Sequence, residues 1–116
     1  MNFIVPLMVY PFDVMASIGQ SDGELKKDLA KYNIEWNDNF KIVGKGRFIM
    51  TDKNQSLIRL LNYPDTNEMY GFLQHEIFHC VTHIMNRIGM KFKLHTSDEA
   101  YSYLVGYLTE KIYDKL

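Results

Sequence analysis

Hydrophobic residues recur with a helical period in the second half of the chain. Over residues 67–88 they follow one another at steps of three and four, giving the stripe Leu73, Ile77, Val81, Ile84 and Ile88. This spacing predicts an amphipathic helix with one apolar face. Gly89 stands where a left-handed C-cap would end the helix, and Asp65 or Thr66 stands where an N-cap would start it.

A second long helix is predicted from Ser97-Asp98 nearly to Leu116. Its buried side would carry Ala100, Leu104, Leu108 and Ile112, which again recur at helical spacing. Asp98 and Glu99 fall in its first turn, where the helix dipole favours acidic side chains. The loop over residues 89–96 is long enough to reverse the chain, so we expect the two helices to be antiparallel.

Shorter apolar segments in the first half of the chain are typical of β-strands. Residues 3–10 are rich in β-branched and aromatic side chains, and Pro11 ends this predicted strand. Further strands are predicted over residues 40–43, 46–51 and 56–62, with turns between them.

A helix is also expected in the first half, because Ser21 and Glu24 have the spacing of a capping box. It would run to about Lys31. A strand, a helix, two or three strands and two long helices in this order predict an α+β fold. No repeat, low-complexity tract or linker divides the sequence, so residues 1–116 are expected to form a single domain.

Composition narrows the classes of function. The 116 residues include 13 basic and 14 acidic side chains, and the resulting net charge of −1 argues against a nucleic-acid partner. The single cysteine, Cys80, excludes an internal disulfide framework and a cysteine-rich zinc ribbon. It is compatible with a reducing compartment, and we expect a cytoplasmic protein.

The apolar start of the chain is too short for a membrane span, which needs about 20 residues. A signal peptide is the alternative, because Val14-Met15-Ala16 loosely resembles a cleavage site. The lack of a basic segment before the apolar run, and Pro6 within it, favour a first β-strand of the core instead. No membrane partner is expected.

The helix predicted over residues 67–88 contains the sequence His75-Glu76-Ile77-Phe78-His79. Two histidines four positions apart on a helix differ by about 40° in azimuth and 6 Å in height, so both imidazoles reach one metal ion from the same side. Glu76 adjoins the first histidine and can receive a proton from a metal-bound water. The pattern predicts Zn²⁺ bound by His75 and His79, with Glu76 as the general base. The alternative is a helix whose histidines are only solvated or hydrogen-bonded.

A catalytic zinc ion needs a third protein ligand and an open position for water. A histidine six residues after His79 would serve, but position 85 is a methionine. Glu99, in the first turn of the next helix, is the predicted third ligand, and Asp98 is the fallback. The alternative for Glu99 is an acid that only stabilises the helix N-terminus. His83 is expected to be solvated or packed rather than a ligand, and Cys80 to be a packing residue.

This arrangement resembles the gluzincin class of zinc metallopeptidases, in which an HExxH helix is followed by a glutamate on the next helix. The closer resemblance is to minimal HExxH-containing proteins of bacteria and phages, and it covers residues 56–112. It implies a small zincin fold, with a twisted, mainly antiparallel sheet of three or four strands packed on the motif helix and a C-terminal helix bearing the glutamate. Gluzincins often carry an aspartate four residues after the third ligand, where this chain has Tyr103.

Motif and resemblance together predict a zinc-dependent peptidase that acts on a peptide or protein substrate. A non-catalytic metal-binding or regulatory module is the alternative, and a small domain without metal is the third. An extended substrate would pair with a sheet edge, and residues 46–51 are the candidate, although an internal strand fits this segment equally well. A regulatory protein partner could also close the open metal position.

Overall fold

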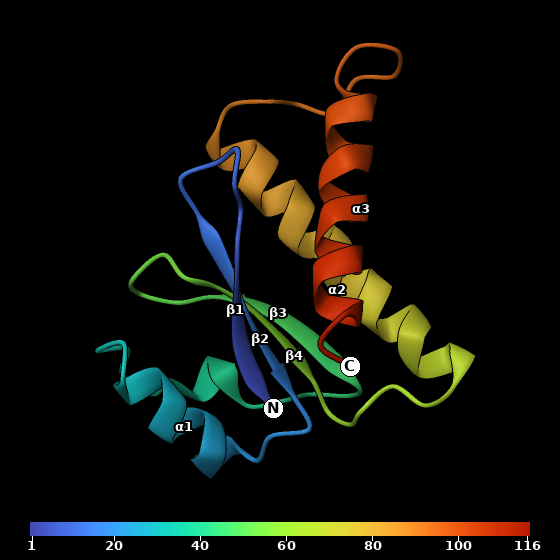
Figure 1. The fold of residues 1–116 in the computed structure, drawn as a ribbon. Helices are drawn as coiled ribbons and strands as arrows, with labels where there is room; N and C mark the ends of the chain where they lie inside the picture. Colours follow the sequence, from blue (N-terminus) through green and yellow to red (C-terminus); the bar gives the residue numbers. More distant parts are fainter.

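The computed structural model describes all 116 residues, and it has the predicted α+β architecture (Figure 1). The chain contains four strands, three α-helices and one short 3₁₀ turn. In order these are β1 (Asn2–Pro6), β2 (Asp13–Ile18), α1 (Asp22–Ala30), η1 (Asp38–Phe40), β3 (Gly46–Met50), β4 (Ser56–Leu60), α2 (Asn67–Arg87) and α3 (Asp98–Tyr113).

The four strands form one mixed sheet in the order β1-β2-β4-β3. The two outer pairs, β1 with β2 and β3 with β4, are antiparallel, whereas the central pair of β2 and β4 is parallel. The prediction of a mainly antiparallel sheet agrees with the two outer strand pairs, but the parallel central pair was not predicted. β3 is an edge strand, which decides between the two interpretations that the sequence left open for residues 46–51.

Alternate residues of the strands face two different hydrophobic clusters. On one face of the sheet, Val14, Ile58 and Leu60 pack with the buried residues of α2 and α3. On the other face, Met15 and Leu57 pack with the buried residues of α1. The sheet is therefore covered on both faces, and Figure 1 shows α1 on the opposite side from the two long helices.

The prediction for the first strand is wrong at its C-terminal end. β1 ends at Pro6, and the chain then turns, with the backbone N–H of Leu7 donating to the carbonyl oxygen of Phe12 at 3.1 Å. Met8 and Val9 lie at the tip of this turn, so their apolar character indicates exposure there rather than a continuing strand. The apolar start of the chain thus forms β1, and none of the helices combines the length and apolar character of a membrane span.

Two further differences concern the strands. The strand predicted over residues 40–43 is absent, because the chain forms η1 up to the buried Phe40 and continues as a loop. β2 was not predicted. It lies between two other strands and is buried from Val14 to Ile18, so it lacks the alternation of polar and apolar residues that marks a half-exposed strand.

The predicted helix ends are confirmed. The Ser21 hydroxyl accepts from the N–H of Glu24, and the Glu24 carboxylate accepts from the N–H of Ser21, both at 3.1 Å. Thr66 is the N-cap of α2, and its hydroxyl accepts from the N–H of Met69 at 3.2 Å. Gly89 follows α2 with φ of +77°, the left-handed conformation that a glycine C-cap adopts.

α2 and α3 are antiparallel neighbours whose alignment is set by hydrogen bonds. The Gln74 amide of α2 donates to the hydroxyls of Thr109 at 2.9 Å and Tyr113 at 3.0 Å. At the other end, the Tyr101 hydroxyl donates to the carbonyl oxygen of Met90 at 2.6 Å. The C-terminal part of α3 therefore lies beside the first half of α2.

Candidate metal centre

α2 carries three potential metal-ligating side chains on consecutive turns. They are His75, Glu76 and His79, and their ligand atoms all lie within 4.8 Å of one another. No other histidine, cysteine, aspartate or glutamate side chains form such a group of three in this structure. The histidines are exposed, whereas Glu76 is only 7% exposed. The three residues that the HExxH pattern singled out are thus brought together.

The two histidine rings direct their Nε2 atoms toward each other. These atoms are 3.1 Å apart, and the ring planes make an angle of 76°. Two zinc–nitrogen bonds of about 2.0–2.1 Å at a tetrahedral angle would hold the nitrogens about 3.3 Å apart. The separation of the two nitrogens is therefore within a few tenths of an ångström of the separation in a zinc site. In the absence of metal, the same separation lets one N–H donate to the other ring.

Neither ring is oriented by a further side chain. The hydrogen bond between the two Nε2 atoms is the one that His75 and His79 make through their rings. Metal-binding histidines usually donate their second ring N–H to a carboxylate, a carbonyl or water. The Thr82 hydroxyl donates to the carbonyl oxygen of His79 at 3.0 Å, which fixes backbone rather than ring. Tyr103, at the position where gluzincins often have an aspartate, is 76% exposed on α3.

Glu76 occupies the border between α2 and the edge strand β3. Its Cγ lies 3.2 Å from the point where a Cβ on Gly46 would be. Gly46 was predicted only as the start of a strand, and its contact with Glu76 was not predicted. A glycine within a predicted strand was the available signal, since it often marks a close approach of another group to the backbone.

The structure does not bring Glu99 to the histidines. Glu99 is exposed in the first turn of α3 and is not part of the group of ligating side chains. On α3 it is Thr109 that bonds to Gln74, the residue directly before His75. Ten residues separate Glu99 from Thr109, or about 15 Å along the helix axis. Asp98, the fallback ligand, is one residue farther away.

The remaining candidates near the motif are packed side chains. The His83 ring contacts Phe48 of β3 with 5.6 Å between the ring centroids. Burial, assisted by the positive charge of Arg87, lowers the pKa of His83. Cys80 is fully buried, and this burial raises the pKa of its thiol to about 12. Cys80 is therefore a packing residue, as predicted, because a thiol in that environment is not ionised near neutral pH.

Comparisons of the chain with models of protein families, with curated proteins and with solved structures give no match. The structure itself shows an α+β domain in which α2 carries the group His75, Glu76 and His79 beside the edge strand β3.

Proposed function

We propose that His75 and His79 bind Zn²⁺ and that Glu76 is the general base of a zinc-dependent peptidase. The observation that carries this proposal is the convergence of the two exposed Nε2 atoms at 3.1 Å, with the Glu76 carboxylate within 4.8 Å of them. Imidazole nitrogen is a preferred ligand of zinc. A bound zinc ion would make a water molecule nucleophilic near neutral pH and polarise a carbonyl group.

Glu76 is suited to proton transfer by its place in the fold. Its side chain is shielded by β3 on one side, while its carboxylate reaches the histidine pair on the other. In peptide hydrolysis it would accept a proton from the attacking water and deliver that proton to the leaving amine. Metal binding alone does not require this residue, so Glu76 separates a catalytic site from a purely binding one.

The free edge of β3 supplies a surface for the substrate. An extended peptide can add a strand to an exposed sheet edge through backbone hydrogen bonds. β3 has one neighbour, β4, and its other edge is unpaired beside α2. A peptide or protein segment paired there would run past Glu76 and the histidines, which favours a peptide bond as the target.

The number of ligands favours a second candidate function, a metal-binding module without catalysis. Two histidines fill two of the four positions of tetrahedral zinc. Glu99, the third ligand that the family resemblance implies, is not part of the group that His75, Glu76 and His79 form. The two remaining positions would accept water, a substrate carbonyl or a side chain of a regulatory protein partner.

Zinc titration followed by peptide cleavage tests the proposal. We expect wild type to bind one zinc ion per chain, and His75→Ala and His79→Ala to weaken binding by more than about a hundredfold, since even the groups that orient ligands contribute ten- to a hundredfold. His95→Asn is the matched control, because His95 is an exposed loop histidine with φ of +66°, which asparagine tolerates. Absence of zinc binding in wild type would reject both candidate functions.

Cleavage of a broad peptide library then separates the two candidates. The peptidase proposal expects Glu76→Gln to keep its affinity for zinc and to lose cleavage by about a hundredfold or more. If wild type and Glu76→Gln both bind zinc and neither cleaves any peptide, the domain is a metal-binding module.

A further inference from the structure

The outer edge of β3 presents backbone groups that have no strand partner. The N–H of Leu61 donates to the carbonyl oxygen of Lys45 at 2.9 Å, so residues 45, 47 and 49 form the hydrogen-bonded pairs of the antiparallel ladder with β4. The residues between them direct their N–H and C=O groups away from β4, and no turn or loop bonds to these groups. The residues whose backbone faces the open edge are Gly46, Phe48 and Met50.

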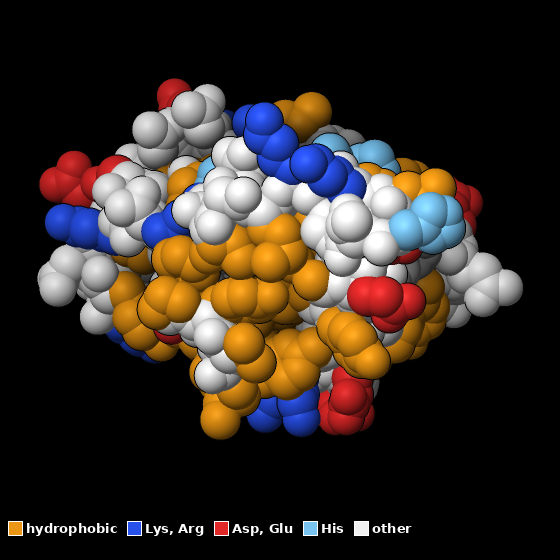
Figure 2. All heavy atoms as spheres, turned by 90° about the horizontal axis from the view of Figure 1, so that it is seen from above, with side chains coloured by type: hydrophobic (Ala, Val, Ile, Leu, Met, Phe, Trp, Pro, Cys, Tyr) orange, Lys and Arg blue, Asp and Glu red, His pale blue; other side chains and the backbone are white.

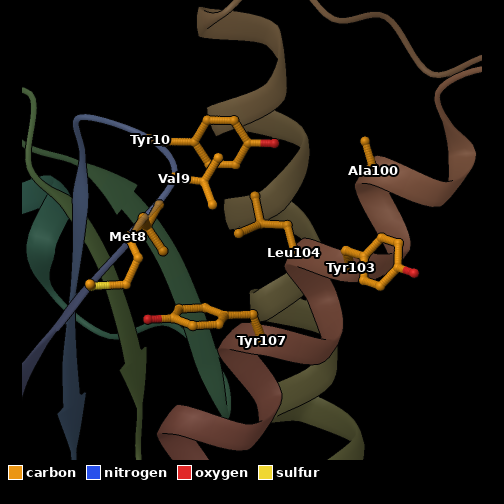
Figure 3. A pocket seen from close by; sticks show the side chains of 8 residues that line it. Met8, Val9, Tyr10, Ala100, Tyr103, Leu104 and Tyr107 are labelled. Atoms are coloured by element: carbon orange, nitrogen blue, oxygen red, sulfur yellow. The ribbon is translucent and has the colours of Figure 1, made fainter.

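The opposite edge of the sheet, on β1, is closed at its end. Pro6 has no N–H to donate to a further strand. Its carbonyl oxygen accepts from the Tyr107 hydroxyl at 2.8 Å, and Figure 3 shows the Tyr107 ring extending from α3 toward β1. Proline and a covering element are two of the ways in which proteins protect an edge from pairing. β3 contains no proline, so of the two outer strands it is the one left open to a further strand.

The two faces of β3 differ in their chemistry. Gly46 is on the side of α2, where Glu76 contacts it. Ile49 is on the other side and packs in the cluster that contains the buried residues of α1. Lys45 and Arg47 share this second face with Ile49, because they precede it by four and by two residues. A strand paired with β3 would therefore meet Glu76 on one face and two basic side chains on the other.

The charges on this second face have one sign. Residues 39–51 contain three basic side chains and no acidic one. Lys41 is paired with Asp38, just before this segment. Lys45 and Arg47 belong to none of the ion pairs of the chain, so no carboxylate lies within 4 Å of their nitrogens. Arg59, the cation opposite Arg47 in the ladder, has a carboxylate partner of its own. Two cations beside the open edge are therefore left without a counter-charge.

This single sign of charge distinguishes the β3 edge from the apolar depression between residues 7–10 and α3. Figure 2 shows basic as well as acidic side chains around the apolar atoms at that end of the molecule. The charges there favour no class of partner, whereas the charges at the β3 edge favour an anionic one.

We propose that the substrate segment bound along β3 is acidic, with carboxylates at two alternate positions, one facing Lys45 and one facing Arg47. In an antiparallel pairing, which is the commoner and slightly more stable arrangement, both carboxylates belong to non-hydrogen-bonded pairs, whose side chains approach most closely. The substrate residue between them lies opposite Gly46 and faces Glu76. This inference rests on the proposed function, because it assigns the substrate class of the same site.

Three synthetic peptides test the proposal on the intact chain, with Glu76→Gln and zinc present so that bound peptides stay whole. Each has about ten residues, mainly threonine and valine, and extends beyond β3 on both sides. The first carries glutamates at two alternate positions, the second carries lysines there, and the third has the two glutamates at neighbouring positions. We expect the first to bind about tenfold more tightly than the second and about threefold more tightly than the third. Its affinity should fall as salt is raised.

N-methylated forms of the first peptide test the pairing with the strand. The residue between the two glutamates donates its N–H to β3, whereas the N–H of each glutamate points away from β3. We expect a methyl group on the central nitrogen to weaken binding by about fivefold or more, and one on a glutamate nitrogen to weaken it by less than about twofold.

Two lysines provide matched variants. Lys45→Glu leaves one positive and one negative side chain beside the edge, so the acidic and the basic peptide should then bind within about twofold of each other. Lys93→Glu is the control and should keep the tenfold preference. Lys93 is also exposed and outside the ion pairs, but it lies in the loop between α2 and α3.

The outcomes separate this inference from the proposed function. If zinc-loaded wild type cleaves the acidic and the basic peptide at equal rates, the peptidase stands and the acidic substrate class is wrong. If the acidic peptide binds selectively but is not cleaved, the peptidase is wrong, and the edge binds an acidic segment for the metal-binding module.

Other results would overturn the inference directly. Equal affinity for alternate and neighbouring glutamates would show general attraction between charges instead of pairs across two strands. Equal effects of the two methyl groups would exclude pairing with β3. Equal effects of Lys45→Glu and Lys93→Glu, or no binding of any peptide, would exclude recognition by the basic face of this strand.

Discussion

The side chain of Glu76 packs against the backbone of Gly46, at the first residue of the edge strand β3. A Cβ atom on Gly46 would lie 3.2 Å from Glu76 Cγ, 3.2 Å from the carbonyl oxygen of Arg59 and 3.3 Å from Leu60 Cδ1. Glycine is therefore what allows β3 to approach both α2 and β4 at this point. The contact holds the proposed general base between the strand and the two histidines.

Gly46→Ala is expected to destabilise the fold by about 1–3 kcal/mol, the usual cost of inserting a methyl group into a packed site. The Arg59 carbonyl belongs to the backbone of β4 and cannot move aside, so the strain falls on Glu76. Urea unfolding measures the change in stability. In the proposed peptidase, cleavage should fall more than the affinity for zinc, because Gly46 contacts Glu76 and not the histidines.

Gly71→Ala is the matched control for Gly46→Ala. Gly71 is an exposed residue of α2, and a Cβ there would have no atom within 4 Å. Alanine should stabilise this helix position by about 1 kcal/mol, since glycine has the lower helix propensity. A stabilising effect of both substitutions would show that the close approach at Gly46 carries no constraint.

Asp22→Asn is expected to reduce stability by about 1–3 kcal/mol, the range for a lost hydrogen bond to a charged group. Arg59 is 1% exposed, and its guanidinium donates to the Asp22 carboxylate at 2.8 Å and to the carbonyl oxygens of Phe40 at 2.7 Å and Gln20 at 2.9 Å. Asp22 is the one acidic side chain in an ion pair with this buried cation. Thermal or urea unfolding measures the loss.

The control for Asp22→Asn is Asp38→Asn, which removes the charge of Asp38 from its ion pair with Lys41. Its atoms are 3.6 Å apart and both side chains are more than half exposed. Asp38→Asn should change stability by less than about 0.5 kcal/mol, because exposed ion pairs contribute little. If the two asparagine variants lose equal stability, burial of Arg59 does not govern the strength of its pair.

The sequence predicted the elements whose pattern is periodic or capped. α2 and α3 were predicted within a few residues because their apolar stripes repeat at helical spacing. α1 was predicted from the capping-box spacing of Ser21 and Glu24, and the structure shows their reciprocal bonds. β2 was missed for the opposite reason. A strand buried on both faces has no alternating pattern, and Ala16 and Ser17 weaken even its apolar character.

The residues of the candidate site also fall into those that the sequence could predict and those that it could not. His75, Glu76 and His79 belong to one helix, so helix geometry alone brings their side chains together. Glu99 lies on another helix, and its distance depends on how far α3 slides along α2. That alignment is set by contacts such as Gln74 with Thr109 and Tyr101 with Met90, which no spacing in the sequence encodes. Gly46 was missed because its role depends on which element packs against β3.

Stability should fall at acidic pH partly through His83. Its pKa is lowered in the folded chain, by burial first and by Arg87 second, from an ordinary value of 6.5. The unfolded chain therefore binds a proton more readily, so this contribution is complete above about pH 6.5 and is lost as the pH falls through the lowered pKa. His83→Gln should flatten the dependence of the unfolding free energy on pH below this value.

Urea unfolding of wild type and His83→Gln across pH 5 to 8 isolates this contribution, since the carboxylates titrate in both proteins. His95→Asn, in the exposed loop between α2 and α3, should leave the wild-type curve unchanged. A wild-type slope in His83→Gln would mean that burial and the charge of Arg87 do not oppose protonation of the His83 ring.

Glu99→Ala is expected to leave the affinity for zinc within about twofold of wild type, a change of less than half a kcal/mol. Glu99 is exposed in the first turn of α3 and is not part of the group of ligand atoms that includes both histidines, whereas a zinc–oxygen bond is about 2.0–2.2 Å long. Glu110→Ala, which removes another exposed acid of α3, controls for the general loss of negative charge. Isothermal titration with zinc compares both variants with His79→Ala. If Glu99→Ala weakens binding as strongly as His79→Ala while Glu110→Ala does not, α3 must shift along α2 when metal binds, and Glu99 is the third ligand.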